Sequence, residues 1–360
     1  MRLIIAGGGT GGHLFPGISV AEEFLARDAS NEVLFVGTER GIESRIVPQL
    51  GMKLECIPAS GVRGKNGLAQ LKGVALFILG YAQSRQILKK FRPDLVLGVG
   101  GYASAPLCLA ARGMQIRSFI HEQNAIPGMT NRLLARFAGK IFISLEESRR
   151  FFPEGRVMFT GNPLRKAILS QVDVVDGTSA APSKDKFNLL VFGGSQGASS
   201  INQALISALP HLGGLRARIS IVHQTGKNDL AEVSAAYQKH GIEASVLPFI
   251  DDMASAYNAA NLVLCRAGAT TIAEVTACGK ACIFIPFPHA VDDHQRKNAE
   301  ALLKQDACLM ILEQELSGER LAEEIQKLTA DPDRVTAIGR NARSLARLDA
   351  AKIIVSEMIG

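Results

Sequence analysis

Two stretches of the chain share one pattern, a short apolar run that ends in clustered glycines and leads into a helix-like segment. Arg2–Ala6 runs into GGGTGG at 7–12, and Asn188–Phe192 runs into GGSQG at 193–197. Apolar runs of this length predict buried parallel strands, and the glycines let the backbone turn tightly and approach a ligand. A strand, a glycine loop and a helix N-terminus together form an anion-binding site. The repeat, about half the chain apart, predicts two similar α/β domains.

Strand and helix patterns alternate through both halves of the chain. In the first half, apolar runs predict strands at 2–6, 32–36, 53–57, 95–98, 117–120, 140–143 and 157–160, with helices near 17–28, 39–50 and 68–91. In the second half, they predict strands at 188–192, 218–223, 244–247, 261–265, 281–285 and 307–311. This alternation is typical of parallel sheets with helices on both faces.

Two segments depart from the alternation. Gln171–Asp185 has little periodicity and is rich in Ser, Ala, Asp and Pro, which is typical of a linker or loop at a domain boundary. In the second glycine stretch, Ser195 or Ser199 is the expected N-cap of the following helix. From about residue 332 onward two helices follow each other without a further strand, so the last helix must pack against a domain already built.

Composition narrows the class of protein. A chain of 360 residues is long enough for two cores, and 47% hydrophobic with 21% charged residues is ordinary for a globular α/β protein. One arginine and four apolar residues precede the first glycines, so we expect no signal peptide. No apolar run approaches the ~20 residues that span a bilayer. Six cysteines without a CxxC pair or a histidine at zinc spacing indicate buried thiols, and we expect no metal site.

Positive charge is concentrated in the first half. Residues 1–166 hold 22 Lys/Arg against 12 Asp/Glu, a net +10, while residues 167–360 hold 18 against 22, a net −4. Gly61–Arg92 has no acidic residue, surrounds the apolar run VALFILGY, and contains seven basic residues: Arg63, Lys65, Lys72, Arg85, Lys89, Lys90 and Arg92. A basic amphipathic helix is typical of an interfacial membrane segment, and the alternative is a core helix with a solvated basic edge. No nucleic-acid-binding motif is present, so we expect no nucleic-acid partner.

Polar residues follow several first-half strands, at the edge where open α/β sheets bind ligands. His13 stands at a helix N-terminus, where the dipole favours a neutral imidazole that can act as a base; the alternative is a packed capping histidine. HEQN (121–124) follows the strand at 117–120. Arg165 lies beyond the turn Gly161–Pro163 and is either a bidentate diphosphate ligand or a surface arginine.

The second half has two comparable stretches. Small residues at Arg266–Thr271 open a helix after a strand and offer N–H groups to phosphate, and Glu274 can accept hydrogen bonds from vicinal ribose hydroxyls or stabilise the helix dipole. Gln295 lies in the polar loop 285–299, where it is either a sugar ligand or a solvated residue. GGGTGG also matches the dinucleotide fingerprint, but the only ribose-binding acid available, Glu39, lies beyond the tip of the second strand.

These motifs together resemble one family, the bacterial peptidoglycan N-acetylglucosaminyltransferases, which have the GT-B glycosyltransferase fold. The shared segments cover nearly the whole chain in family order: GGGTGGHLFPG (7–17), GVGGYAS (98–104), HEQNAIPG (121–128), GNPLR (161–165), FGGSQGA (192–198), PFIDDM (248–253), CRAGATTIAE (265–274) and PFPHAVDDHQRKNA (286–299). The last segment departs from the family pattern by one additional residue, which affects the alignment of Gln295 against His294.

The resemblance implies an α/β GT-B architecture: two Rossmann-like domains with parallel sheets facing across a cleft, and a C-terminal helix that crosses back to the first domain. It places an acceptor- and membrane-binding domain at 1–166 plus about 341–360, and a UDP-sugar-binding domain at 167–340. It implies an inverting transfer of N-acetylglucosamine from UDP-N-acetylglucosamine to the 4-hydroxyl of the muramic acid sugar of undecaprenyl-pyrophosphoryl-MurNAc-pentapeptide (lipid I), giving lipid II. It also implies no cofactor or obligate metal, and a peripheral place on the cytoplasmic side of the cell membrane.

The resemblance also implies a role for particular residues. His13 matches the proposed catalytic base. The substrate-binding residues would be Thr10, Gly11, Gly12, Asn124, Arg165, Ser195, Ile250, Ala269, Thr270, Thr271, Ile272, Ala273, Glu274 and Gln295. Both first-half glycine loops are candidates for the acceptor pyrophosphate, through Gly9, Gly100, Gly101 and Tyr102.

Three alternatives to this function can be separated by experiment. A nicotinamide-dependent oxidoreductase would bind the dinucleotide and not a UDP-sugar. A non-catalytic binding protein for UDP-sugars or anionic lipids would bind without turnover. Another GT-B enzyme, such as a UDP-N-acetylglucosamine 2-epimerase or a different lipid glycosyltransferase, is disfavoured by HEQN and GGSQGA.

Overall fold

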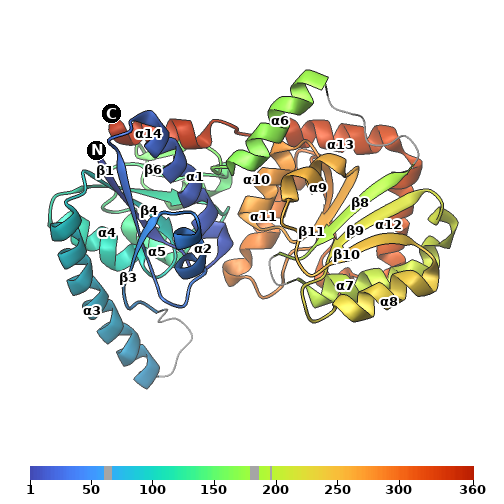
Figure 1. The fold of residues 1–360 in the computed structure, drawn as a ribbon, viewed down its shortest axis with the longest axis horizontal. Coiled ribbons are helices and arrows are strands. Elements are labelled where there is room, and N and C mark those ends of the chain that lie inside the picture. Colours follow the sequence, from blue (N-terminus) through green and yellow to red (C-terminus); the bar gives the residue numbers. More distant parts are fainter. Residues whose placement is uncertain (61–66, 179–185, 195–196) are drawn as a thin grey trace. The chain divides into compact units, whose positions relative to one another are not determined.

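The structure, a computed structural model, describes residues 1–60, 67–178, 186–194 and 197–360 (Figure 1). The chain divides into two compact units, residues 1–165 with 347–360 and residues 166–346. The boundaries therefore fall within a few residues of the glycine-asparagine-proline turn and the start of the last helix.

The first unit contains a parallel sheet of seven strands in the order β3-β2-β1-β4-β5-β6-β7. The strands are β1 (Arg2–Gly7), β2 (Glu32–Gly37), β3 (Lys53–Cys56), β4 (Leu95–Gly100), β5 (Arg117–Glu122), β6 (Ile141–Ile143) and β7 (Val157–Phe159). The helices are α1 (Gly11–Arg27), α2 (Glu43–Gln49), α3 (Gly67–Phe91), α4 (Ser104–Gly113), α5 (Met129–Leu134) and α14 (Ala350–Ile359), with a 3₁₀ turn at Glu146–Phe151.

Both faces of this sheet are covered, as the uninterrupted apolar strands predict. Leu3 and Ile5 of β1 point into a core shared with α1 and α14, while Ile4 and Ala6 point into a core shared with α4. Figure 1 shows α14 beside α1, and Ile354 of α14 is fully buried there. The last helix thus completes the core of the first unit.

The second unit contains a parallel sheet of six strands in the order β10-β9-β8-β11-β12-β13. The strands are β8 (Phe187–Phe192), β9 (Ile219–Gln224), β10 (Glu243–Leu247), β11 (Leu262–Cys265), β12 (Ala281–Phe284) and β13 (Leu309–Met310). The helices are α6 (Lys166–Thr178), α7 (Ser199–Ala208), α8 (Leu230–His240), α9 (Met253–Ala259), α10 (Ala269–Ala277), α11 (His294–Leu303), α12 (Gly318–Ala330) and α13 (Pro332–Ser344). The prediction of two α/β units with parallel sheets is confirmed.

Strand order in each sheet reverses at one point. The reversal lies between β1 and β4 in the first unit and between β8 and β11 in the second. Open α/β sheets bind ligands beyond the carboxyl ends of the strands at such a switch point. The glycine loops that the sequence singles out follow these four strands, so the fold gathers them at one switch point in each unit.

Two local expectations are wrong. The composition predicts a linker or loop at 171–185, but residues 171–178 belong to helix α6, and residues 179–185 lie outside the described part of the chain. Ile168 and Val172, four residues apart, are buried, so an apolar stripe anchors the helix despite the polar composition. Helix α7 begins at Ser199 after Ala198, which has no side-chain cap to offer, so Ser199 is not the N-cap. Ser195, the other expected cap, lies outside the described residues.

Candidate active site

The two glycine loops of the first unit pack backbone against backbone. A Cβ on Gly7 would lie 2.2 Å from the carbonyl oxygen of Gly100, and a Cβ on Gly101 would lie 2.5 Å from that of Gly8. The Ser104 hydroxyl fastens the contact because it lies within hydrogen-bonding distance of the Ala6 and Gly100 carbonyl oxygens, at 2.5 and 2.9 Å. Only glycine permits this approach, which leaves the main-chain N–H groups of both loops at one end of the sheet.

A buried carboxylate shapes the first loop. Glu43 of α2 is 1% exposed, and it accepts hydrogen bonds from the backbone N–H of Gly9 at 2.7 Å and of Thr38 at 2.9 Å. A Cβ on Gly8 would lie 2.4 Å from this carboxylate. Glu43 is not among the residues predicted from the sequence. Its only sequence signal is an acid at the start of a helix that follows a strand end.

His13 lies in the first turn of α1, at the base of the first loop. Its Nδ1 lies 2.9 Å from Oε1 of Gln123, and a Cβ on Gly100 would lie 2.8 Å from the same nitrogen. Thr10 is the N-cap of α1, but its hydroxyl makes no capping hydrogen bond to the helix N-terminus formed by Gly11 and Gly12. The structure therefore places His13, Gly100 and an uncapped helix N-terminus together.

The HEQN segment ends β5 and continues into a loop held by Glu122. This carboxylate is buried and accepts hydrogen bonds from the backbone N–H of Asn124 at 2.9 Å, from that of Gly128 at 3.2 Å and from Nδ2 of Asn131 at 2.9 Å. Asn124, a predicted substrate ligand, is therefore held by its own backbone at the end of β5. As in an Asx turn, the side-chain carboxylate of Glu122 accepts hydrogen bonds from backbone N–H groups that have no main-chain acceptor in this loop.

The other first-unit candidates lie around this centre. The guanidinium of Arg165 stacks over the ring of Phe15 in α1, with 5.1 Å from Cζ to the ring centroid. Gly161 lies against Arg347, because a Cβ there would be 2.3 Å from the Cβ of Arg347. Tyr102, in the second glycine loop, is 60% exposed, so its ring is accessible to a ligand.

In the second unit, one glutamine joins two predicted donor segments. Gln224, at the end of β9, donates to the carbonyl oxygen of Gly194 at 2.6 Å and accepts from the backbone N–H of Ile250 at 2.8 Å. Ile250, expected to contact the uracil, is buried. Gln224 is also absent from the residues predicted from the sequence, although a polar residue at the carboxyl end of a predicted strand is the signal that identified the other candidates.

Helix α10 presents an uncapped N-terminus at the switch point. Its N-cap is Gly268 without a side-chain hydrogen bond, and Ala269, Thr270 and Thr271 form the first turn. The hydroxyl oxygen of Thr270 is buried and has no hydrogen-bond partner among the residues that the structure describes. Uncapped N–H groups, the helix dipole and this hydroxyl all suit a phosphate oxygen. Ile272, Ala273 and Glu274 follow in the same helix.

A buried arginine forms hydrogen bonds to the loops beside α10. Arg266 is 9% exposed, donates to the carbonyl oxygens of Ile285 and Pro286 at 3.1 Å each, and pairs with Glu313 at 2.6 Å. Its Nη2 also donates to the hydroxyl of Ser200 at the start of α7. A buried charge is tolerated where it is paired and hydrogen-bonded. The guanidinium of Arg266 therefore links the loop at residues 285–286, the start of α7 and Glu313.

The loop at 285–299 has an unusual backbone. Asp292 and Asp293 both adopt left-handed conformations, with φ of 53° and 55°. Gln295, in the first turn of α11, accepts a 3.0 Å hydrogen bond from the backbone N–H of Phe287. His294 contacts the carbonyl oxygen of Val291 through Nδ1 at 2.7 Å. Residues 287–295 thus form a compact turn that is closed by Gln295.

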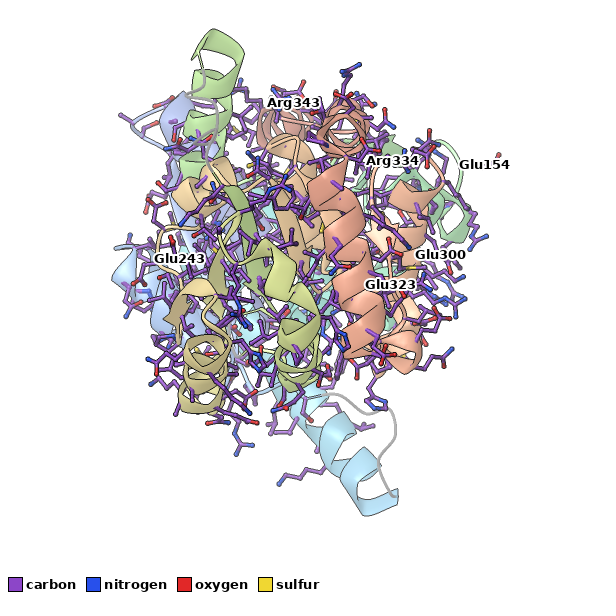
Figure 2. The ribbon with its side chains drawn as sticks, turned by 90° about the vertical axis from the view of Figure 1, so that its right-hand side faces the viewer. Glu154, Glu243, Glu300, Glu323, Arg334 and Arg343 are labelled. Carbon is purple, nitrogen blue, oxygen red and sulfur yellow. The ribbon has the colours of Figure 1, made fainter. Side chains whose placement is uncertain are left out.

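Charged side chains on both units form ion pairs. Glu243, Glu300, Glu323 and Arg334, labelled in Figure 2, each form an ion pair on the second unit. On α3 of the first unit, Lys72 and Lys89 are exposed, and Lys90 pairs with Glu55 at 3.1 Å. No helix among the described residues is long and apolar enough to cross a bilayer, and these residues contain no cluster of three metal-binding side chains.

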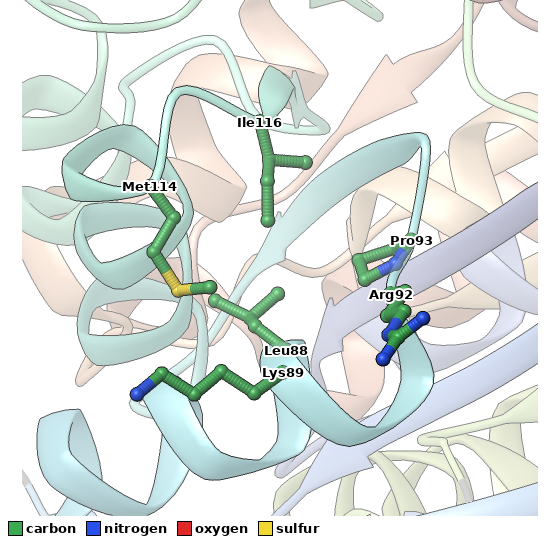
Figure 3. A pocket seen from close by; sticks show the side chains of 6 residues that line it. All are labelled: Leu88, Lys89, Arg92, Pro93, Met114 and Ile116. Atoms are coloured by element: carbon green, nitrogen blue, oxygen red, sulfur yellow. The ribbon is translucent and has the colours of Figure 1, made fainter.

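An open pocket of about 530 Å³ lies at the C-terminal end of α3, away from the glycine loops (Figure 3). Four apolar side chains and two basic ones line it: Leu88, Pro93, Met114, Ile116, Lys89 and Arg92.

The two Rossmann-like units, the glycine loops at both switch points and the C-terminal helix returned to the first unit define the GT-B class. Family models then identify the member: glycosyltransferase family 28 N-terminal domain matches residues 3–143, and the family 28 C-terminal domain matches residues 188–354. The chain therefore belongs to glycosyltransferase family 28.

Relatives and solved structures agree with this assignment. The UDP-N-acetylglucosamine–N-acetylmuramyl-(pentapeptide) pyrophosphoryl-undecaprenol N-acetylglucosamine transferase of Geotalea uraniireducens is 67% identical over 358 residues, covering 99% of this chain and 98% of that protein. MurG of Acinetobacter baumannii is 30% identical, with a TM-score of 0.81 and 99% of each chain covered. UDP-GlcNAc 2-epimerase of Neisseria meningitidis matches with a TM-score of 0.68 over 100% of both chains, but at 13% identity it is similar in fold alone.

Proposed function

We propose that this protein transfers N-acetylglucosamine from UDP-N-acetylglucosamine to the 4-hydroxyl of the muramic acid sugar in undecaprenyl-pyrophosphoryl-MurNAc-pentapeptide, for peptidoglycan synthesis. The observation that carries the proposal is the 67% identity to a transferase of that name over almost the full length of both chains. The reaction inverts the anomeric centre. The acceptor oxygen forms a bond to the anomeric carbon, the bond from that carbon to the diphosphate breaks, and UDP leaves with the electron pair.

An inverting transfer needs a base at the acceptor hydroxyl, and we assign this role to His13. The imidazole is half-buried at the N-terminus of α1, beside both glycine loops. The neutral form of an imidazole is the one that can accept a proton from the acceptor hydroxyl. Gly9, Gly100, Gly101 and the exposed Tyr102 are the candidate contacts of the acceptor pyrophosphate. The backbone N–H groups of Gly9 and Gly100 donate to Glu43 and Ser104, so any contact of these two glycines with the pyrophosphate uses other atoms or requires these hydrogen bonds to change.

The departing UDP needs charge stabilisation, which we assign to the second unit. The uncapped first turn of α10 offers N–H groups and the Thr270 hydroxyl to the diphosphate. Glu274 is the candidate ribose ligand, Ile250 the uracil contact, and Gln295 the sugar contact. Asn124 and Arg165 of the first unit complete the substrate-binding set, and Ser195 belongs to it by motif alone. We expect these residues to support transfer without added metal.

The membrane surface is the proposed source of the lipid acceptor, and α3 is the proposed contact. Val74, Ile78 and Leu79 of this helix are 49%, 61% and 55% exposed, and Val74 and Ile78 lie on the same side of it. Figures 1 and 2 both show the N-terminal part of α3 projecting beyond the rest of the first unit. Exposed apolar side chains flanked by Lys72 and Lys89 suit the interface of a bilayer with anionic headgroups. We therefore propose a peripheral location on the cytoplasmic side of the cell membrane.

Turnover tests the proposed function directly. Purified protein is incubated with radiolabelled UDP-N-acetylglucosamine and a short-chain lipid I analogue, in buffer with and without EDTA, and products are separated by chromatography. We expect a β-1,4-linked disaccharide product in both buffers. Binding of the UDP-sugar without transfer would support a binding protein, and formation of N-acetylmannosamine would support an epimerase.

A further inference from the structure

We propose that Gln123 is a positioning residue that fixes the tautomer of His13, so that the Nε2 lone pair of this imidazole remains available for the acceptor proton. The inference rests on the function proposed above and adds to it a residue that contacts no substrate. Gln123 is 1% exposed, and it lies between the imidazoles of His13 and His121.

The orientation of the Gln123 amide follows from its partners. Its Nε2 lies 2.9 Å from the carbonyl oxygen of Val99 and 3.0 Å from Nδ1 of His121. A carbonyl oxygen can only accept a hydrogen bond, so the group that faces Val99 must be the NH₂. Both amide protons then have acceptors, and Oε1 is left to face His13.

The tautomer of His13 follows from that orientation. An amide oxygen can only accept, so the Nδ1 of His13, at 2.9 Å from Oε1, must carry the proton. In the neutral imidazole the lone pair is then on Nε2. This nitrogen is the one able to accept a proton from a bound hydroxyl, because Nδ1 is already engaged with Gln123.

The hydrogen bonds of His121, on the other side of Gln123, also determine the orientation of the Gln123 amide. Since Nδ1 of His121 accepts from Gln123, the neutral His121 carries its proton on Nε2, which faces the Ser144 hydroxyl at 3.1 Å and the Gly161 carbonyl oxygen at 3.4 Å. Complete burial lowers the pKa of His121 to about 4, so this histidine stays neutral near pH 7. The hydrogen bonds therefore all run in one direction: His13 donates to Gln123, Gln123 donates to His121, and His121 donates to Ser144.

Close packing against Gly100 also limits the His13 ring. A Cβ on Gly100 would lie 2.8 Å from Nδ1 and 2.9 Å from Cε1 of this imidazole. A ring flipped by half a turn would lose the hydrogen bond to Gln123 and place a carbon against Oε1. The amide of Gln123 thus selects the ring orientation and the tautomer, and the absence of a side chain at Gly100 makes room for the ring.

Nitrogen NMR of the protein labelled with ¹⁵N-histidine tests the inference without reference to activity. The spectrum of His13→Asn identifies the resonances of His13 by their absence. We expect the wild-type protein to show a proton on Nδ1 and a lone-pair nitrogen at Nε2 at pH 7.5. A proton on Nε2 would overturn the inference, whether or not the protein proves to be a transferase.

Kinetics of Gln123→Met provide the second test, since methionine is of similar size and makes no amide hydrogen bond. We expect kcat to fall about tenfold or more, with the KM for UDP-N-acetylglucosamine within about twofold of the wild-type value. The exposed Gln203→Met is the matched control and should leave kcat unchanged. A wild-type kcat, or retention of the Nδ1-protonated form, in Gln123→Met would overturn the inference.

Gln123→Glu covers the case in which Gln123→Met does not fold. Its carboxylate can accept from Nδ1 of His13 but cannot donate to Val99. We expect Nδ1 of His13 to stay protonated in this variant, and a neutral imidazole with its only proton on Nε2 would overturn the inference.

Discussion

The phenol of Tyr257 donates a 3.2 Å hydrogen bond to Oε2 of Glu274, and both side chains are buried, Glu274 with only 5% exposure. One carboxylate oxygen is thereby oriented from within the protein, at the end of the sheet where α10 begins. A carboxylate held in this way loses little conformational entropy when it accepts hydrogen bonds from a ligand.

Glu274→Ala is therefore expected to weaken the binding of UDP-N-acetylglucosamine. Loss of hydrogen bonds to a charged acceptor costs ~1.5–3 kcal/mol, which corresponds to about a 10- to 150-fold higher Kd. Isothermal titration calorimetry measures the change. Tyr257→Phe is the control, since it removes the internal hydrogen bond and keeps the carboxylate. Unchanged affinity in folded Glu274→Ala would contradict the ribose assignment.

His13→Ala is expected to reduce turnover far more than donor binding. Removal of a general base lowers kcat by roughly 10²- to 10⁴-fold, whereas the Kd for UDP-N-acetylglucosamine should change by less than about twofold. Single-turnover kinetics and calorimetry separate the two effects. The exposed His211→Ala serves as control. Near-normal turnover in His13→Ala would exclude this residue as the base.

Neutralising Lys72, Arg85 and Lys89 to Gln is expected to reduce binding to vesicles that contain anionic lipid, because each basic residue near such a surface contributes about 1 kcal/mol. Activity on a soluble, short-chain acceptor should be retained. Vesicle co-sedimentation at two salt concentrations measures the effect.

The control for this variant changes the same number of charges on the second unit, at Arg216, Lys239 and Lys304, which are exposed. If both triple variants bind vesicles as the wild-type protein does, α3 is not the membrane contact.

Gly101→Ala is expected to destabilise the first unit more than Gly155→Ala does. The two glycines have nearly the same φ, 80° and 79°, so the backbone penalty of about 1 kcal/mol is common to both. A Cβ at Gly101 would lie 2.5 Å from the Gly8 oxygen, while one at Gly155 meets nothing within 4 Å. Urea unfolding of the two variants measures the difference, and equal stabilities would show that the contact between the loops is dispensable.

Stability is expected to fall in acid because two buried histidines are kept neutral. Burial lowers the pKa of His121 and of His223 to about 4, from an ordinary 6.5. The unfolded chain therefore binds more protons between these values, so the free energy of unfolding is highest above pH 6.5 and decreases as pH falls toward 4. Each histidine contributes on the order of 3 kcal/mol over this range.

Urea unfolding at pH 7.0 and pH 5.0 tests this expectation, with His121→Asn compared against His211→Asn at an exposed position. The pH dependence should shrink in His121→Asn and persist in His211→Asn. An equal dependence in both variants would mean that His121 does not contribute.

Much of the fold could be predicted from the sequence because its signals are local. Apolar runs such as Ile4–Ala6 and Leu189–Phe192 identified the strands, and glycine clusters identified the turns that follow them. Parallel strands place their carboxyl ends at one edge, so the strand pattern alone also predicts which candidate ligands share that edge. Residues 171–178 show the limit: the composition of 171–185 predicted a linker or loop, but 171–178 belong to a helix whose Ile168 and Val172 are buried.

The sequence by itself determined the two-unit α/β plan, the motif order and hence the family, because strand patterns and glycine turns depend on neighbouring residues. Only the tertiary structure decided which side chains, far apart in the sequence, form hydrogen bonds with one another. Glu43 caps the loop at Gly9, Gln224 joins Gly194 to Ile250, and Gln123 faces His13 from 110 residues away. Such hydrogen bonds depend on strand order, side-chain rotamer and amide orientation, and no local pattern along the chain encodes those three together.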